Sequence, residues 1–151
     1  MNPEAWMNEA LELAAVAAAA GEVPIGAVVV DAEDQIIGRG RNTREGADDP
    51  LGHAEIHAIA EAARAIGDWR LVGTTMVVTL EPCAMCAGAI VNARIDRLIF
   101  GALDPKAGFC GSLGDLTRDA RLNHRLAVTA GVLAEECGDL LRSFFGALRD
   151  K

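Results

Sequence analysis

The sequence lacks any apolar run that is long enough to span a bilayer. Its longest run, from Leu13 to Ala20, is mostly alanine and falls far short of the roughly 20 residues that a membrane helix needs. The first residues contain no lysine or arginine, so we expect no secretory signal. No internal repeat, Ser/Pro-rich linker or low-complexity tail divides the 151 residues. We therefore expect one domain, residues 1–151, in a cytoplasmic protein with no membrane partner.

Cysteine is scarce, with four residues in the chain. Four cysteines could form two disulfides, but Cys83 and Cys86 stand in a C-x-x-C pair that follows a histidine motif. This arrangement favours metal binding in a reducing compartment over disulfides. Cys110 and Cys137 have no paired spacing, and Cys137 falls on the apolar stripe of the last predicted helix. We expect Cys137 in the core.

Basic residues are in deficit, because 14 Lys and Arg face 22 Asp and Glu, for a net charge of −8. Phosphate contacts dominate nucleic-acid affinity, so this charge argues against nonspecific binding to nucleic acid. The basic residues nevertheless gather in three clusters: Arg39, Arg41 and Arg44; Arg118, Arg121 and Arg125; and Arg142, Arg149 and Lys151. Each cluster is either a local binding surface for one RNA or merely a solvated face.

The hydrophobic pattern predicts helices that alternate with strands. The predicted helices cover residues 4–20, 53–66, 82–94 and a stretch from Val132 onward, and the predicted strands cover 25–30, 36–41, 75–80, 97–100 and 127–129. The first two strands form a hairpin, and residues 42–52 form a loop. Such an alternation indicates an α/β fold, a three-layer α/β/α sandwich around a five-stranded mixed sheet.

The residues with the clearest chemistry are His53, Glu55, Cys83 and Cys86, in the pattern H-x-E followed by P-C-x-x-C. One imidazole and two thiolates give three ligands for a tetrahedral zinc and leave the fourth position open for water, as in catalytic sites. Glu55 is then a carboxylate beside the metal that can move protons. Residues i and i+2 of a helix do not share a face, so His53 and Glu55 converge only if His53 lies at the irregular start of its helix.

The two remaining histidines are weaker candidates. His57 follows His53 by four residues, the spacing of the histidine pair in zinc proteases, but that motif needs Glu where Ala54 stands. We expect His57 on the helix surface or behind the metal ligands. His124 could contact a ligand or bridge backbone groups, and the sequence leaves both open.

The H-x-E…P-C-x-x-C arrangement is the signature of zinc nucleobase deaminases, and the chain resembles one family of them from about Glu4 to Arg149. It resembles the bacterial tRNA-specific adenosine deaminases, which convert the wobble adenosine of an anticodon to inosine on a cytidine-deaminase-like fold. The matching segments are Gly21–Ala27, Asn42, Asp49-Pro50 with His53–Glu55, Thr79–Gly88, Gly101–Lys106, Gly111–Leu113, Asn123–Arg125 and Phe144-Phe145. The chain differs from the usual pattern at Leu51-Gly52 and Phe109-Cys110.

The resemblance implies a role for several residues. It implies one zinc ion per subunit, bound by His53, Cys83 and Cys86, with Glu55 as the proton shuttle of a hydrolase. It also implies substrate contacts to a tRNA anticodon stem-loop, made by Asn42, the backbone around Ala54, Asp104, Lys106 and Phe145. A homodimer is implied in the same way.

Two alternatives to tRNA editing remain open. The first is a deaminase of free guanine or small nucleosides on the same fold, which the net charge and Phe109 would suit. The second is a non-catalytic, zinc-containing RNA-binding module. A structural zinc site has no use for Glu55, which disfavours the second alternative.

Overall fold

The computed structural model describes residues 1–150, so Lys151 of the third basic cluster lies outside the described residues. The helices are α1 (Pro3–Ala19), α2 (Ala54–Ile66), α3 (Ala84–Asn92) and α4 (Ala134–Arg149). The strands are β1 (Gly26–Val30), β2 (Ile36–Arg41), β3 (Thr75–Leu80), β4 (Arg97–Ala102) and β5 (Ala127–Ala130). Within residues 1–150, no helix combines the length and the apolar character that crossing a membrane requires.

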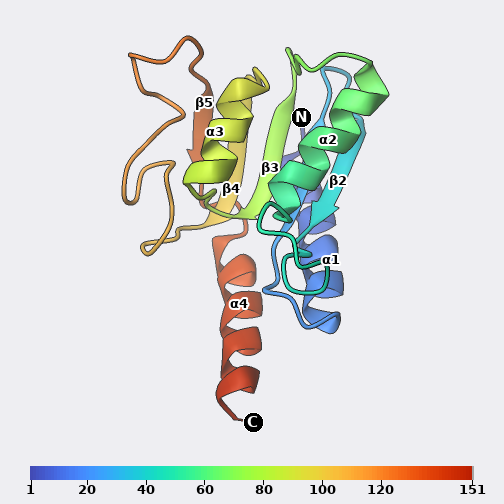
Figure 1. Ribbon diagram of the computed structural model, residues 1–151, viewed down its shortest axis with the longest axis vertical. Coiled ribbons are helices and arrows are strands. Elements are labelled where there is room, and N and C mark those ends of the chain that lie inside the picture. The colour runs from blue at the N-terminus through green and yellow to red at the C-terminus, as the bar shows by residue number, and fades with distance from the viewer. Residues whose placement is uncertain (151) are drawn as a thin grey trace.

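The five strands form one mixed sheet in the order β2-β1-β3-β4-β5. β1 pairs antiparallel with β2 and β3, whereas β3, β4 and β5 run parallel. Helices α2 and α3 cover one face of the sheet, and α1 and α4 lie on the other (Figure 1). Each face has its own cluster of buried apolar side chains. The predicted three-layer α/β/α sandwich is therefore confirmed.

The β1–β2 hairpin shows why the local predictions succeeded. Asp31 accepts backbone N–H bonds from Glu33 and Gln35, both at 2.9 Å, through one carboxylate oxygen. Asp34 completes the turn with φ +63°, a left-handed conformation that aspartate tolerates better than most residues. The turn places β2 at the edge of the sheet beside β1.

Helices α1 and α2 lie unusually close to the hairpin because glycines face them. A Cβ atom on Gly26 would be 2.0 Å from the carbonyl oxygen of Ala10 in α1. On β2, a Cβ on Gly38 or Gly40 would lie 2.2 Å or 2.1 Å from a carbonyl oxygen of α2. Because the backbone of β2 approaches the backbone of α2 directly at these glycines, the distance between α2 and the sheet is fixed.

Two helix predictions need correction. α3 spans Ala84–Asn92 and not residues 82–94, because Cys83 is the extended N-cap and Arg94 has a left-handed φ of +64°. In α4 the predicted apolar stripe is only partly covered: Cys137 is buried, but Leu148 is 49% exposed. The prediction that Cys137 belongs to the core is confirmed.

Candidate active site

Three potential metal ligands converge where α2 and α3 begin. His53 Nδ1 lies 3.6 Å from Cys83 Sγ and 3.4 Å from Cys86 Sγ. The three ligand atoms all lie within 4.8 Å of one another. This His/Cys/Cys group could hold a metal ion, and it unites residues that are 30 and 33 positions apart.

The local backbone explains how these side chains meet. His53 is the N-cap of α2 with extended angles, φ −84° and ψ 151°, and it therefore precedes the first helical residue. Cys83 is the N-cap of α3 with φ −72° and ψ 176°, and Cys86 follows in the first turn. The expectation that His53 lies at the irregular start of its helix is confirmed. Both helix N-termini point toward the group, an arrangement that favours negative charge and hence thiolates.

The surroundings of this group shift the pKa values of the Cys83 thiol and the Glu55 carboxyl. The hydrogen bond from Cys86 is the largest of several causes that lower the pKa of Cys83 to about 4. Glu55 is 4% exposed, and burial raises the pKa of its carboxyl to about 7. A carboxyl with such a pKa can both accept and donate a proton near neutral pH.

The side chain of Glu55 lines a small inner cavity of about 110 Å³. His53 and Cys83 line this cavity with Glu55, together with Ile25, Leu80, Glu81, Asp104 and Ala107. A larger outer cavity of about 400 Å³ shares His53, Asp104 and other lining residues with it. A molecule in the outer cavity can therefore extend one end toward Glu55.

The outer cavity collects most of the substrate residues that the resemblance implied. Asn42, Asp104, Lys106 and Phe145 all line it, and Arg44, Leu103 and Leu141 join them. Ala54 lines neither cavity, and its side chain is fully buried in the apolar cluster beneath α2, so the implied contact from the backbone around Ala54 stays a prediction. Of the implied substrate residues, the structure thus places all but Ala54 at one opening.

Asn42 and Asp104 already hold their own loops in shape. Asn42 donates through Nδ2 to the carbonyl of Val23 at 3.2 Å and accepts through Oδ1 from the N–H of Arg44 at 3.1 Å. An amide has two donors and two lone pairs, so half of its hydrogen-bonding capacity remains for a ligand. Asp104 Oδ1 accepts from the backbone N–H groups of Lys106 and Ala107, at 3.1 and 3.2 Å.

The weaker candidates from the sequence have structural partners. His57 bonds through Nε2 to the hydroxyl of Thr43 at 2.8 Å, and it lies outside the metal-ligand group. His124 bonds through Nε2 to the carbonyl of Ile95 at 2.7 Å, so this ring nitrogen has a backbone partner. Cys110 is buried, and burial raises the pKa of its thiol.

Two buried carboxylates, Glu22 and Glu81, received no role from the sequence. Glu22 accepts backbone N–H bonds from Glu45 at 3.0 Å and Gly46 at 2.6 Å, and these bonds lower the pKa of its carboxyl. Glu81 is 2% exposed and lies directly before Pro82 and Cys83. The signal in the sequence is a carboxylate at the end of a buried strand, which needs buried hydrogen-bond donors to be tolerated.

Comparison with known proteins identifies relatives with the same architecture. Residues 1–149 match the family model of the MafB19-like deaminases. The tRNA-specific adenosine deaminase of Bacillus subtilis is 50% identical over 148 residues, which are 98% of this chain and 91% of that protein. A structure from a study of A-to-I editing by tRNA:A34 deaminases is 41% identical with a TM-score of 0.86, and the match covers 90% of this chain and 98% of that one.

A more distant relative has a different substrate in its name. The guanine deaminase of Nitrosomonas europaea is 25% identical with a TM-score of 0.81, and the match covers 96% of this chain and 85% of that one. Its agreement with the present fold is nearly as good, but its sequence is further away. The full-length match at 50% identity and the family model together decide the membership. The chain belongs to the MafB19-like deaminases and, among them, to the family of tRNA-specific adenosine deaminases.

Proposed function

We propose that this protein is a zinc-dependent hydrolase that deaminates adenosine to inosine at the wobble position of a tRNA anticodon. The observation that carries the proposal is the position of Glu55 beside the His/Cys/Cys group, at the end of a cavity that opens toward Lys106 and Phe145. The names of the relatives agree with this substrate.

The spacing of the three ligands supports zinc. Bond lengths of about 2.0–2.1 Å to nitrogen and 2.3 Å to sulfur, at a tetrahedral angle, put the nitrogen and sulfur atoms about 3.6 Å apart. The distances from His53 Nδ1 to the two sulfur atoms, 3.6 and 3.4 Å, are close to this value. His53, Cys83 and Cys86 would hold the ion and leave one position for water. When bound, zinc lowers the pKa of that water to about 7.

Glu55 carries the proton transfers of the reaction. It takes a proton from the attacking water as the water oxygen adds to the ring carbon that bears the amino group. It delivers this proton to the neighbouring ring nitrogen, and it passes the second water proton to the departing amine. Water and adenosine thus give inosine and ammonia. Burial at 4% exposure keeps bulk water from competing for these protons.

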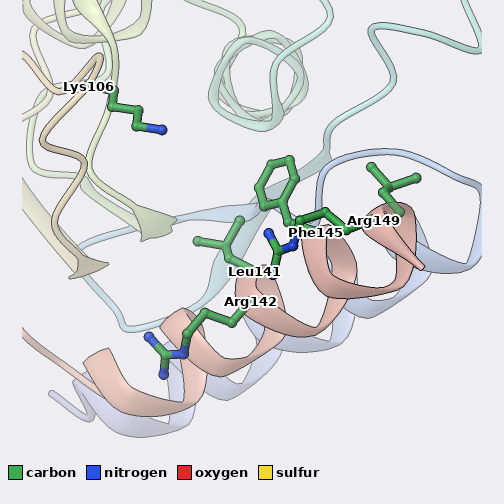
Figure 2. Close-up of a pocket in the computed structure, with 6 residues that line it drawn as sticks. Lys106, Leu141, Arg142, Phe145 and Arg149 are labelled. Carbon is green, nitrogen blue, oxygen red and sulfur yellow. The ribbon is translucent and has the colours of Figure 1, made fainter. Parts of the chain in front are cut away.

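The surface around the opening supports an RNA substrate. From the outer cavity, a groove of about 530 Å³ continues along α4. Figure 2 shows Lys106 on one side of this groove and Leu141, Arg142, Phe145 and Arg149 of α4 on the other. Lys106 and Arg149 beside the ring of Phe145 are suited to phosphates next to a stacked base, whereas Arg142 is paired with Asp139. A free base needs no such extension beyond the cavity, which favours RNA over guanine.

The decisive experiment offers the zinc-loaded protein an anticodon stem-loop with a wobble adenosine and, separately, free adenosine, cytidine and guanine. Conversion is scored by mass spectrometry, and a chelator-treated sample is the control for the metal. We expect inosine in the stem-loop and no turnover of the free compounds. Turnover of a free compound with an unchanged stem-loop would contradict the proposal and establish a salvage deaminase.

We also propose that the chain is a single-domain, cytoplasmic protein that forms a homodimer. All four cysteines are free, as a reducing compartment would leave them. Several large apolar side chains are exposed on the isolated chain, among them Trp69, Val72 and Leu103, and a second copy could cover part of them. Sedimentation of the purified protein tests the dimer, and a monomer at micromolar concentration would contradict it.

A further inference from the structure

The loop that follows β4 carries four residues of the outer cavity, Leu103, Asp104, Lys106 and Ala107, but has no regular secondary structure that would hold it. It runs from residue 103 to residue 126, and Asp104 and Lys106 lie near its start. In Figure 1 it is the long segment that connects β4 to β5. Loops of this length are uncommon in compact domains unless they serve a function, and they need internal anchors to keep one conformation.

Glu81 is such an anchor, because its carboxylate accepts four hydrogen bonds from this loop. Oε1 accepts from the N–H of Asp104 at 3.0 Å and from the hydroxyl of Ser112 at 2.5 Å. Oε2 accepts from the N–H groups of Cys110 and Ser112, at 3.1 and 3.0 Å. A buried carboxylate is tolerated only when its lone pairs have such partners.

The loop also passes directly over this carboxylate. A Cβ atom on Gly108 would lie 2.3 Å from Cδ of Glu81, so only glycine fits there. The next residue, Phe109, donates its N–H to the carbonyl of Pro82 at 2.9 Å, and Gly108 is paired with Cys83 as an isolated bridge. The loop is therefore bonded to three consecutive residues, Glu81, Pro82 and Cys83, the last of which belongs to the metal-ligand group.

We propose that Glu81 is a positioning residue that sets the place of Asp104 and Lys106 relative to the metal-ligand group and thereby controls RNA affinity. The inference rests on the proposed function, because it assigns RNA contacts to that loop. Glu81 lines the inner cavity, but both of its carboxylate oxygens are bonded to the loop, so we assign it no contact with the reacting atoms. Its effect passes through the N–H of Asp104, whose side chain shapes the turn that carries Lys106.

The variant Glu81→Gln tests this with little change of shape. A glutamine has one acceptor oxygen and one NH2 group. Its oxygen can accept either from Asp104 N–H and the Ser112 hydroxyl or from the N–H groups of Cys110 and Ser112, but not from both pairs. The best orientation keeps the bonds to Cys110 and Ser112 N–H and sets the NH2 group against the N–H of Asp104. The variant therefore releases the end of the loop that carries Lys106.

The experiment uses the zinc-loaded full chain and measures zinc content, amide hydrogen exchange and kinetics on the anticodon stem-loop. For Glu81→Gln we expect faster exchange confined to residues 103–113, unchanged zinc content, and a KM that rises about 10-fold with kcat nearly constant, as the loss of one hydrogen bond to a charged group predicts. Ser112→Ala is the matched control. It removes the hydroxyl bond and keeps the three backbone bonds to Glu81, so we expect exchange and KM close to the wild type.

Three results would overturn the inference. The first is unchanged exchange in residues 103–113 of Glu81→Gln. The second is faster exchange throughout the chain with loss of zinc, which would make Glu81 a general stability residue. The third is a lower kcat at constant KM. Failure of the proposed function is distinguishable, because it appears as a wild-type protein that does not convert the stem-loop. The exchange comparison still decides the role of Glu81 then, since it needs no substrate.

Discussion

The contact between β2 and α2 makes Gly40→Ala a sensitive test of how the site is positioned. The added Cβ would lie 2.1 Å from the carbonyl oxygen of Ala54, 2.8 Å from the nitrogen of Ala58 and 2.9 Å from Cβ of His57. Ordinary contacts begin at 3.4 Å, so the first overlap is about 1.3 Å and involves backbone that has no rotamer to change. The start of α2 must therefore move away from the sheet by about 1 Å.

This movement displaces His53 and Glu55, because they are the direct neighbours of Ala54. Overpacking costs about 1–3 kcal/mol of unfolding free energy. A misplacement of about 1 Å in an active site can lower the rate about 100-fold. We expect Gly40→Ala to fold with reduced stability and to lose far more activity than its stability loss explains.

The measurements are chemical denaturation and kcat/KM on the stem-loop, with Gly146→Ala as the matched control. A Cβ on Gly146 in α4 would have its nearest neighbour, Arg149, at 3.9 Å. This substitution improves helix propensity by up to about 1 kcal/mol and should leave the rate unchanged. Wild-type stability and activity in Gly40→Ala would refute the close approach of α2 to β2.

Three further predictions concern single side chains. The variant Glu55→Gln should keep its metal and lose about 10²–10⁴-fold in kcat, because it removes the group that moves the protons. Single-turnover kinetics and a metal assay measure both effects, and a nearly normal rate would remove Glu55 from the mechanism. Lys106→Ala should weaken stem-loop binding and reduce the slope of log affinity against log salt by about one; titrations at several salt concentrations measure the slope, and an unchanged slope would contradict a phosphate contact. Glu22→Gln should destabilise the protein at pH 7 but not in acid. The folded protein lowers the pKa of Glu22 below its ordinary 4.5, so this stabilisation is complete above that value and is lost as the pH falls through the folded pKa. Denaturation curves at about pH 7 and at the lowest pH at which both proteins stay folded compare the two, and a difference that does not shrink as the pH falls would contradict a role for the ionised carboxylate.

The His/Cys/Cys group could be predicted from the sequence because its motifs are local. Cys83 and Cys86 lie within one turn, and the i, i+2 spacing of His53 and Glu55 forced His53 to the end of its helix, where the structure has it. The role of Glu81 could not be predicted in this way. Its partners lie 23 to 31 residues later in an irregular loop, and no periodicity connects a carboxylate to backbone N–H groups at such separations.

The strand and hairpin predictions succeeded for a similar reason, since turn residues and apolar runs are short-range signals. The limits of α3 were wrong because Pro82 is equally suited to a position just before the N-cap and to the first turn. The stripe on α4 predicted a helix correctly but not its burial. Periodicity shows which face is apolar, whereas the extent of cover depends on how far the sheet reaches beneath the helix.

The shallow attachment of α4 has a consequence for how the chain opens. Among the described residues of α4, the buried one is Cys137, which lies one turn into the helix. Toward its C-terminus the helix extends beyond the sheet (Figure 1). The last turns, with Phe145 and Arg149, can therefore fray without exposing either apolar cluster, at a small fraction of the free energy of global unfolding. In the proposed RNA complex these turns become ordered on binding, so association should have a larger entropic cost than binding to the sheet-supported part of the site alone.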